Sequence, residues 1–136
     1  MALTHRVTTS VRSNAGTVTS SAYTLTGTAE TNVELESLAI GTDVAQDFTS
    51  DVSTIVSLAI SWEPDTGSSS LTMKTNNSGA PDDTLTILAD NPLIWNTTIE
   101  DTIGTACPLT VDVTTGLFLT NSVAGDLSIY VLHNGS

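Results

Sequence analysis

The segment Ile55-Val-Ser-Leu-Ala-Ile-Ser-Trp62 decides the fold. Its even-numbered positions are aliphatic or aromatic, and the odd-numbered positions after Ile55 are serine or alanine. Successive side chains of a strand point to opposite faces of a sheet, so this alternation is typical of a strand with one face in a core. The sequence therefore predicts a central strand over residues 55–62.

The same alternation of aliphatic residues with threonine or serine runs along most of the chain, and serine and threonine together make up about 30 % of it. No segment carries a convincing helical period. Nine or ten short strands are predicted, at 6–12, 17–28, 31–40, 55–62, 71–75, 85–88, 93–95, 109–113, 117–119 and 127–133. This spacing indicates an all-β fold, a two-sheet β-sandwich, with a jelly roll as its architecture and another Greek-key sandwich as the alternative.

Two of these strands have an alternation that slips by one position. The slips lie between Ser20 and Ala22 and near Ser37. Each predicts a β-bulge or a bend, as where a long strand turns between two sheets. The segment 43–51 is predicted to be a polar connection with one turn of helix.

A chain of 136 residues is expected to form one domain. Residues 17–136 are predicted to be the sandwich, and residues 1–16 an N-terminal arm or edge strand. Arg6 and Arg12 stand an even number of positions apart, so an extended segment places both on one face. Such charges either discourage edge-to-edge aggregation or contact an acidic neighbour, and we interpret Arg6 and Arg12 as candidate partner contacts.

The charge balance excludes two classes of partner. The chain has 15 acidic residues against three basic ones, a formal net charge of −12, and a pI near 4.1. Nucleic acid and anionic membrane surfaces are therefore not expected as partners. The N-terminus has no apolar signal segment and Cys107 is the only cysteine, which predicts synthesis in a reducing cytoplasm.

The reactive side chains form no recognisable catalytic set, so we expect no enzyme, no cofactor and no metal site. Cys107 with His133 is only a formal nucleophile and base pair, and a semi-buried thiol is the preferred interpretation. Asp82 and Asp83 follow Pro81 between two strands, which is turn chemistry, with calcium binding as the alternative left open.

Carbohydrate binding is a competing function, because small β-sandwiches bind sugars through exposed aromatic platforms. Aromatic residues are only 4 % of the chain. Trp62 and Trp95 each continue an aliphatic register, which predicts that they lie in a core or an interface.

Two C-terminal strands are apolar on both registers, which is more than a lone sandwich buries. The excess indicates either a central strand covered by a loop or a subunit interface. We therefore predict a homo-oligomer, with these candidate interface residues: Leu117, Phe118, Leu119, Ile129, Tyr130, Val131 and Leu132.

Residues 70–133 carry a family resemblance. The run from Leu71 to Trp95 contains Thr75-Asn76-Asn-Ser78, Asp83-Thr84-Leu, and Pro92-Leu-Ile-Trp95 in that order. It resembles a segment of small structural proteins of tailed bacteriophages, and the stretch from Val113 to the closing Ile129-Tyr-Val131 strand is similar in kind.

The resemblance implies a virion component, a capsid decoration or cement protein of jelly-roll type that stands on the capsid surface as a homotrimer. The viral capsid protein would then be the partner, with Arg6 and Arg12 at the contact. A head fibre or a receptor- or carbohydrate-binding β module is the alternative.

Overall fold

The computed structural model describes residues 2–12, 14, 16 and 18–135, and at residues 9–12, 18–21, 101 and 102 only the backbone is described. Ten strands and two short helices follow along this part of the chain: β1 (Leu3–Arg12), β2 (Val18–Gly27), β3 (Ala29–Leu38), β4 (Gly41–Gln46), the 3₁₀ helix η1 (Val52–Thr54), β5 (Ile55–Pro64), β6 (Leu71–Thr75), β7 (Thr84–Ile87), β8 (Leu93–Asn96), α1 (Thr97–Ile103), β9 (Leu117–Asn121) and β10 (Gly125–His133).

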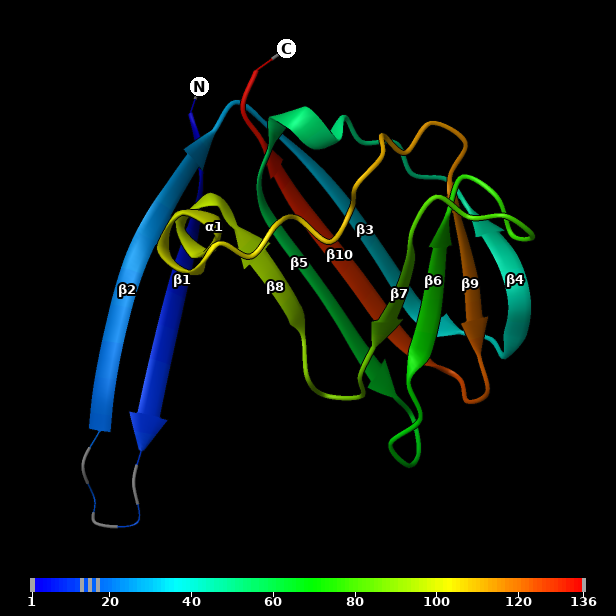
Figure 1. Ribbon diagram of the computed structural model, residues 1–136. Helices are drawn as coiled ribbons and strands as arrows, with labels where there is room; N and C mark the ends of the chain where they lie inside the picture. The colour runs from blue at the N-terminus through cyan, green and yellow to red at the C-terminus, as the bar shows by residue number, and fades with distance from the viewer. Residues whose placement is uncertain (1, 13, 15, 17, 136) are drawn as a thin grey trace.

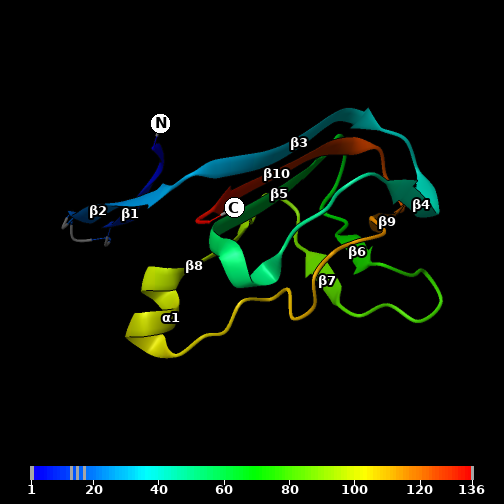
Figure 2. The same ribbon diagram turned by 90° about the horizontal axis from the view of Figure 1, so that it is seen from above.

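Eight of the strands form two four-stranded antiparallel sheets that pack face to face (Figures 1 and 2). One sheet has the order β3-β10-β5-β8, and the other has the order β4-β9-β6-β7. The remaining strands, β1 and β2, pair only with each other, in a hairpin that belongs to neither sheet. The predicted all-β sandwich is thus confirmed, with a hairpin added to it.

The strand pairs are nested about one central hairpin. β6 pairs with β7, β5 with β8, β4 with β9, and β3 with β10. Within the two sheets, β10 also pairs with β5 and β9 with β6. The eight sheet strands therefore form four nested antiparallel pairs, with the β6–β7 hairpin at the centre.

The core fills the space between the two sheets. Its largest fully buried side chains come from both layers: Leu58, Ile60 and Trp62 of β5, Leu71 and Met73 of β6, Leu117 and Leu119 of β9, and Leu127 and Ile129 of β10. Each such side chain contributes about 1.5–3 kcal/mol by leaving water. Trp62 is fully buried and Trp95 is 4 % exposed, so the prediction that both lie inside is confirmed.

The register predictions have different outcomes. Near Ser37 the pairing of β3 with β10 shifts between Leu35 and Leu38, and Ser37 has a φ of 55°, so the predicted bulge is confirmed. Between Ser20 and Ala22 the pairing of β1 with β2 runs without a shift, so that predicted bulge was wrong. The hairpin tolerates the slip because neither of its faces has to match a continuous core.

Three segments differ from prediction. The predicted connection over 43–51 overlaps strand β4, which spans Gly41–Gln46, and the helical turn η1 lies just after the connection, at Val52–Thr54. Thr97–Ile103, where the sequence shows no convincing helical period, is helix α1, which begins at the N-cap Asn96 and ends at Gly104 in the left-handed conformation. Residues 109–113, predicted as a strand, contribute only the isolated bridge between Ser50 and Val113.

Candidate functional site: the hairpin and the outer face of its sheet

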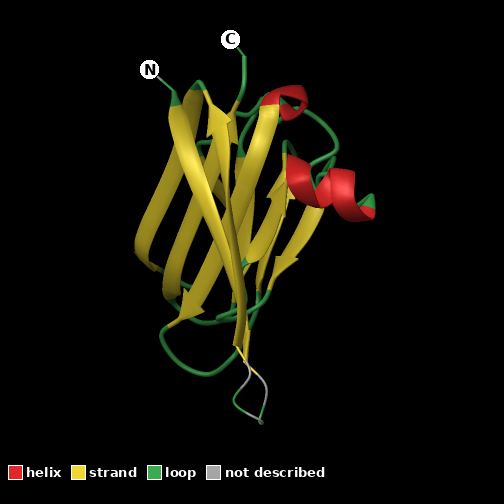
Figure 3. Ribbon diagram, turned by 90° about the vertical axis from the view of Figure 1, so that its left-hand side faces the viewer, coloured by secondary structure: helices red, strands yellow, loops and turns green. Residues whose placement is uncertain are grey.

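The base of the β1–β2 hairpin, near the chain termini, packs on the outer side of the β3-β10-β5-β8 sheet, and the rest of the hairpin extends past the edge strand β8 (Figures 1 and 3). Along β10, Leu127, Ile129 and Val131 point into the core, whereas Leu132 belongs to the outer register. Leu132 is nevertheless fully buried, because Gly27 at the end of β2 packs directly on it. The hairpin therefore covers one row of the outer face.

Polar contacts fix the hairpin to the sheet. The Tyr23 hydroxyl accepts a hydrogen bond of 2.9 Å from Asn96 Nδ2 on β8, and His5 Nε2 lies 2.9 Å from Glu30 Oε1 on β3. Asn96 is fully buried, and its Oδ1 also accepts the Ile99 N–H that begins helix α1. The same amide thus connects the hairpin, the edge strand and the helix.

The C-terminal segment also connects the hairpin to the sandwich through hydrogen bonds. The Thr28 N–H donates to the His133 carbonyl at 2.8 Å, and the Thr28 hydroxyl donates to the Gly135 carbonyl at 3.0 Å. The Gly135 N–H lies 3.1 Å from the same hydroxyl. These bonds hold the base of the hairpin at a fixed place on the sheet.

A groove of about 510 Å³ runs between β1 and the uncovered part of the outer face. The five consecutive residues Thr4 to Thr8 form one wall, and Ser57, Ala59, Ile94 and Tyr130 form the floor. Side chains alternate between faces along a strand, so a groove lined by five consecutive residues meets the main chain of β1 as well as its side chains. Within the described residues no strand other than β2 pairs with β1, which leaves the main-chain groups of its other edge open.

The groove differs in charge from the rest of this acidic chain. Among the described residues its lining contains Arg6 and no acidic residue. Two carboxylates adjoin it through lining residues: Glu30 lies beside His5, and Glu34 accepts from the Tyr130 hydroxyl. Next to it on the same face, a second groove of about 190 Å³ is acidic, with Glu34, Glu36, Glu63 and Asp126 in its lining. The second groove is therefore the more acidic part of the outer face.

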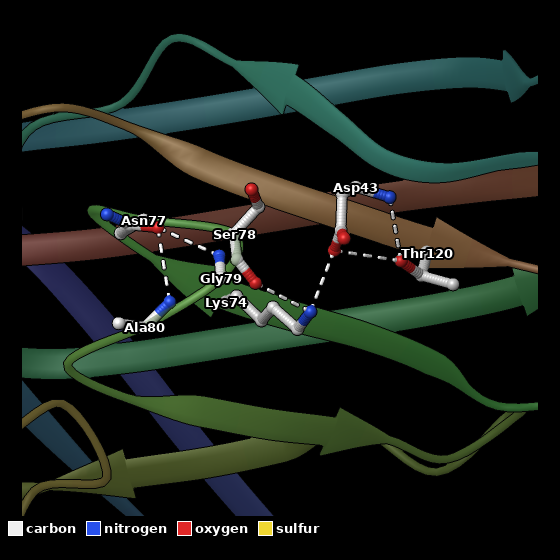
Figure 4. A network of polar contacts seen from close by, with 7 residues as sticks. All are labelled: Asp43, Lys74, Asn77, Ser78, Gly79, Ala80 and Thr120. Carbon is white, nitrogen blue, oxygen red and sulfur yellow. Dashed lines mark hydrogen bonds and ion pairs between the residues drawn. The ribbon is translucent and has the colours of Figure 1, made fainter.

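The other described cation is committed to an internal contact. Lys74 Nζ donates to Asp43 Oδ1 and to the Ser78 carbonyl, both at 2.9 Å, and the Asp43 N–H donates to the Thr120 hydroxyl (Figure 4). Arg6 has no carboxylate within ion-pair distance among the described side chains. Arg6 is thus the described permanent cation that remains available to a partner, while the side chain of Arg12 lies outside the description.

The candidate interface residues do not form one surface. Leu117, Leu119, Ile129, Val131 and Leu132 are at most 1 % exposed within the single chain, so they have no surface to offer to a partner. Their burial explains the apolar residues on both registers of β10: the sandwich core covers one face and the hairpin covers Leu132 on the other. Only Phe118 and Tyr130 keep partial exposure, and they lie on different sheets.

Sequence reasoning missed the groove because its residues come from four strands. Ile94 is 47 % exposed between the buried Trp95 and the half-buried Leu93. The apolar run Leu93-Ile-Trp95 has aliphatic residues on both registers, which was a signal that one of them lies outside the core. Which strand would lie beside Ile94 could not be read from that run.

A second cavity, of about 460 Å³, lies where η1, β3 and the end of β10 meet. In it, His133 Nδ1 lies 3.0 Å from the Thr54 hydroxyl, and this hydroxyl donates to the Asp51 carbonyl at 2.8 Å. Thr54 must then accept the Nδ1 proton, which leaves Nε2 unprotonated. Burial lowers the pKa of His133, against the opposing effect of the Asp51 carboxylate.

The neighbours of the Cys107 thiol differ from those of His133. Burial raises the pKa of its thiol, and the carboxylates of Glu100 and Asp83 raise it further, whereas a backbone hydrogen bond at Leu109 lowers it. A protonated thiol is a weak nucleophile. The partners recorded for His133 are Thr54 and Thr31, so the formal pairing of Cys107 with His133 is not formed.

Asp82 and Asp83 hold loops. The Asp83 carboxylate accepts the Thr110 N–H at 2.9 Å and its hydroxyl at 2.6 Å, and the Asp82 carboxylate accepts from Asn76 Nδ2 at 2.6 Å. The two side chains thus fasten the 76–83 loop internally and to the segment after helix α1. Within the described residues, no cluster of three or more histidine, cysteine, aspartate or glutamate side chains could hold a metal ion.

Across the described ranges, no helix has the length and apolar character needed to span a bilayer. No family model, curated protein or solved structure matches the chain.

Proposed function

We propose that the chain is a non-enzymatic structural protein of a tailed-bacteriophage virion, of the capsid decoration or cement type. In this role it is made in the host cytoplasm and then binds the capsid surface, where it bridges and stabilises subunits of the major capsid protein. The resemblance over residues 70–133 supports the family, and a rigid two-sheet body suits a mechanical role.

The proposed fold of this body is a jelly roll. The support for it is the nested pairing of β3 with β10, β4 with β9, β5 with β8 and β6 with β7, divided between two sheets. A ribbon of eight antiparallel strands wound into two sheets is the arrangement of jelly rolls, which occur in viral capsid and lectin domains.

The observation that carries the proposed function is the β1–β2 hairpin. It lies outside both sheets and presents Arg6 without a carboxylate partner among the described side chains, on a chain with a net charge of −12. A cation that the protein does not use internally is suited to an acidic capsid surface. We place the capsid contact on this hairpin, with Arg12 as a second contributor.

We further propose a homotrimer on the shell. Phe118 and Tyr130 are the interface candidates that keep partial exposure. Light scattering with size-exclusion chromatography at micromolar concentration tests this part by itself, and a monomer would contradict it.

The capsid role is tested by co-sedimentation of the purified chain with capsids that lack it, followed by imaging of the loaded particles. Hundreds of copies per particle are expected of a cement protein, on the order of the number of capsid subunits. A few copies per particle would instead indicate a head fibre or receptor-binding module, and binding to a glycan array without particle binding would indicate a free carbohydrate-binding module.

The contact is tested by the double variant R6Q/R12Q, which removes two positive charges. The control is T66E/S68E, which changes the net charge equally at two exposed loop positions. Occupancy on particles should fall only for R6Q/R12Q. Equal occupancy of the two variants would show that the hairpin is not part of the capsid contact.

A further inference from the structure

We infer that the groove beside β1 binds an extended, acidic segment of the partner protein, which adds to the open edge of β1 as a third strand. The inference rests on the proposed function, because it names the chemistry of the partner at the same hairpin. It differs from a contact of Arg6 alone, because it requires main-chain pairing and an occupied groove.

The first step of the argument is the exposed edge. β1 pairs with β2 along its whole length, and its other edge pairs with no described strand. Thr4 to Thr8 of this strand line the groove. A two-stranded hairpin is only marginally stable by itself, and an open edge is a template for another strand. A partner segment of about five residues, roughly 17 Å when extended, would pair along Thr4 to Thr8.

The second step is the floor of the groove. Tyr130 on β10 pairs with Ala59 on β5, and Ala59 pairs with Ile94 on β8, so the three form one row across the outer face. Ala59 is small, which leaves depth between its two larger neighbours. A strand added beside β1 would turn alternate side chains onto this row, and an aliphatic side chain there would cover the exposed part of Ile94.

The third step is charge. Arg6 lines the groove, and no acidic residue is among the described residues of the lining. Glu30 is paired with His5 and Glu34 with the Tyr130 hydroxyl, so both neighbouring carboxylates already have a partner. The neighbouring groove with Glu34, Glu63 and Asp126 repels an acidic segment that moves further across the sheet. An acidic residue of the partner is therefore attracted at one end of the face and excluded from the other, which fixes the register of the added strand.

The first arm of the test needs no virus. The full chain, labelled for NMR, is titrated with the peptide Ac-Thr-Val-Glu-Val-Thr-NH2 and with the same peptide carrying lysine in place of glutamate. The acidic peptide should shift the amide signals of Thr4 to Thr8 and Ile94, and should bind roughly tenfold more tightly than the lysine peptide. Equal binding of both peptides, or shifts confined to other surfaces, would overturn the inference.

The second arm uses particles and a matched pair of variants. I94E places a carboxylate at the groove, and L88E places one at another exposed aliphatic residue, which is 52 % exposed and lies outside the groove. Particle occupancy should fall roughly tenfold for I94E and stay unchanged for L88E. Normal occupancy of a folded I94E variant would contradict binding in the groove but not the capsid role. A lack of particle binding by the unaltered chain would contradict the capsid role.

Discussion

Gly27 lies so close to Leu132 that no side chain fits between them: a Cβ on Gly27 would stand 2.7 Å from Leu132 Cγ and 2.4 Å from the His133 carbonyl oxygen. Neither distance is compatible with normal van der Waals contact. The close approach brings the base of the hairpin onto the sheet and buries Leu132. The placement of the whole candidate site thus depends on a glycine.

Replacing Gly27 by alanine should therefore displace the hairpin. Because the clash involves backbone, we expect a loss of about 1–3 kcal/mol in the free energy of unfolding, measured by urea denaturation. Amide hydrogen exchange in β1 and β2 should become faster. The control is Gly79→Ala, where the new Cβ would meet only Asn77 Oδ1 at 3.7 Å. Equal effects of the two substitutions would contradict the close packing.

The Asp83 carboxylate should act as a loop anchor and not as a calcium ligand. Asp83→Ala leaves the Thr110 N–H and hydroxyl without their acceptor, which should lower the free energy of unfolding by about 1–3 kcal/mol. The loss should be the same with and without added calcium. Stabilisation of the unaltered chain by calcium, absent in Asp83→Ala, would restore the calcium interpretation.

The local pattern predicted the strands far better than their partners. Residues 55–62 alternate cleanly, and β5 is an internal strand with Leu58, Ile60 and Trp62 in the core. Alternation reports one buried face, which is a local property. The pairing of β1 with β2 outside both sheets is a non-local property, and nothing in residues 1–28 distinguishes a hairpin from two sheet strands.

Two segments differ from prediction because of the hydrogen bonds that their backbone makes. Residues 109–113 alternate like a strand, yet the N–H groups of Thr110 and Val111 bond to the Asp83 carboxylate in place of a neighbouring strand. Helix α1 has seven residues, too few to show a period, and depends on its N-cap Asn96. In residues 109–113 a side chain distant in sequence supplies the hydrogen bonds, and in helix α1 an N-cap supplies them. Neither source is visible as a period in the sequence.

Stability should depend on pH through His133. Burial lowers its pKa below the ordinary value of 6.5, so between these two pH values the unfolded chain binds more protons than the folded chain. The stabilisation from neutral His133 is complete above about pH 6.5 and is lost as the pH falls through the lowered pKa. The other groups of this chain titrate too, so the measurement is a difference between the unaltered chain and His133→Asn.

The free energy of unfolding of the unaltered chain minus that of His133→Asn should decrease from about pH 8 to about pH 5. Asp51 and Asp112 line the same cavity, and the Asp51 charge favours protonated His133, which limits the decrease. A difference that grows on acidification would show that the charged imidazole is the form that the fold stabilises, against the direction expected from burial.

The bond between Tyr23 and Asn96 should attach the hairpin to β8 and should be separable from the cap of helix α1. Tyr23→Phe removes only the hydroxyl that contacts Asn96, so we expect a loss of about 0.5–1.5 kcal/mol and faster amide exchange in β1 and β2. Asn96→Ala also removes the acceptor of the Ile99 N–H, so its loss should exceed that of Tyr23→Phe by about 1 kcal/mol, the usual value of an N-cap. In the double variant the tyrosine contribution should vanish, because its partner is already gone. Strictly additive losses would mean that the two groups do not interact, and the hairpin would then be held by the His5, Gly27 and Thr28 contacts.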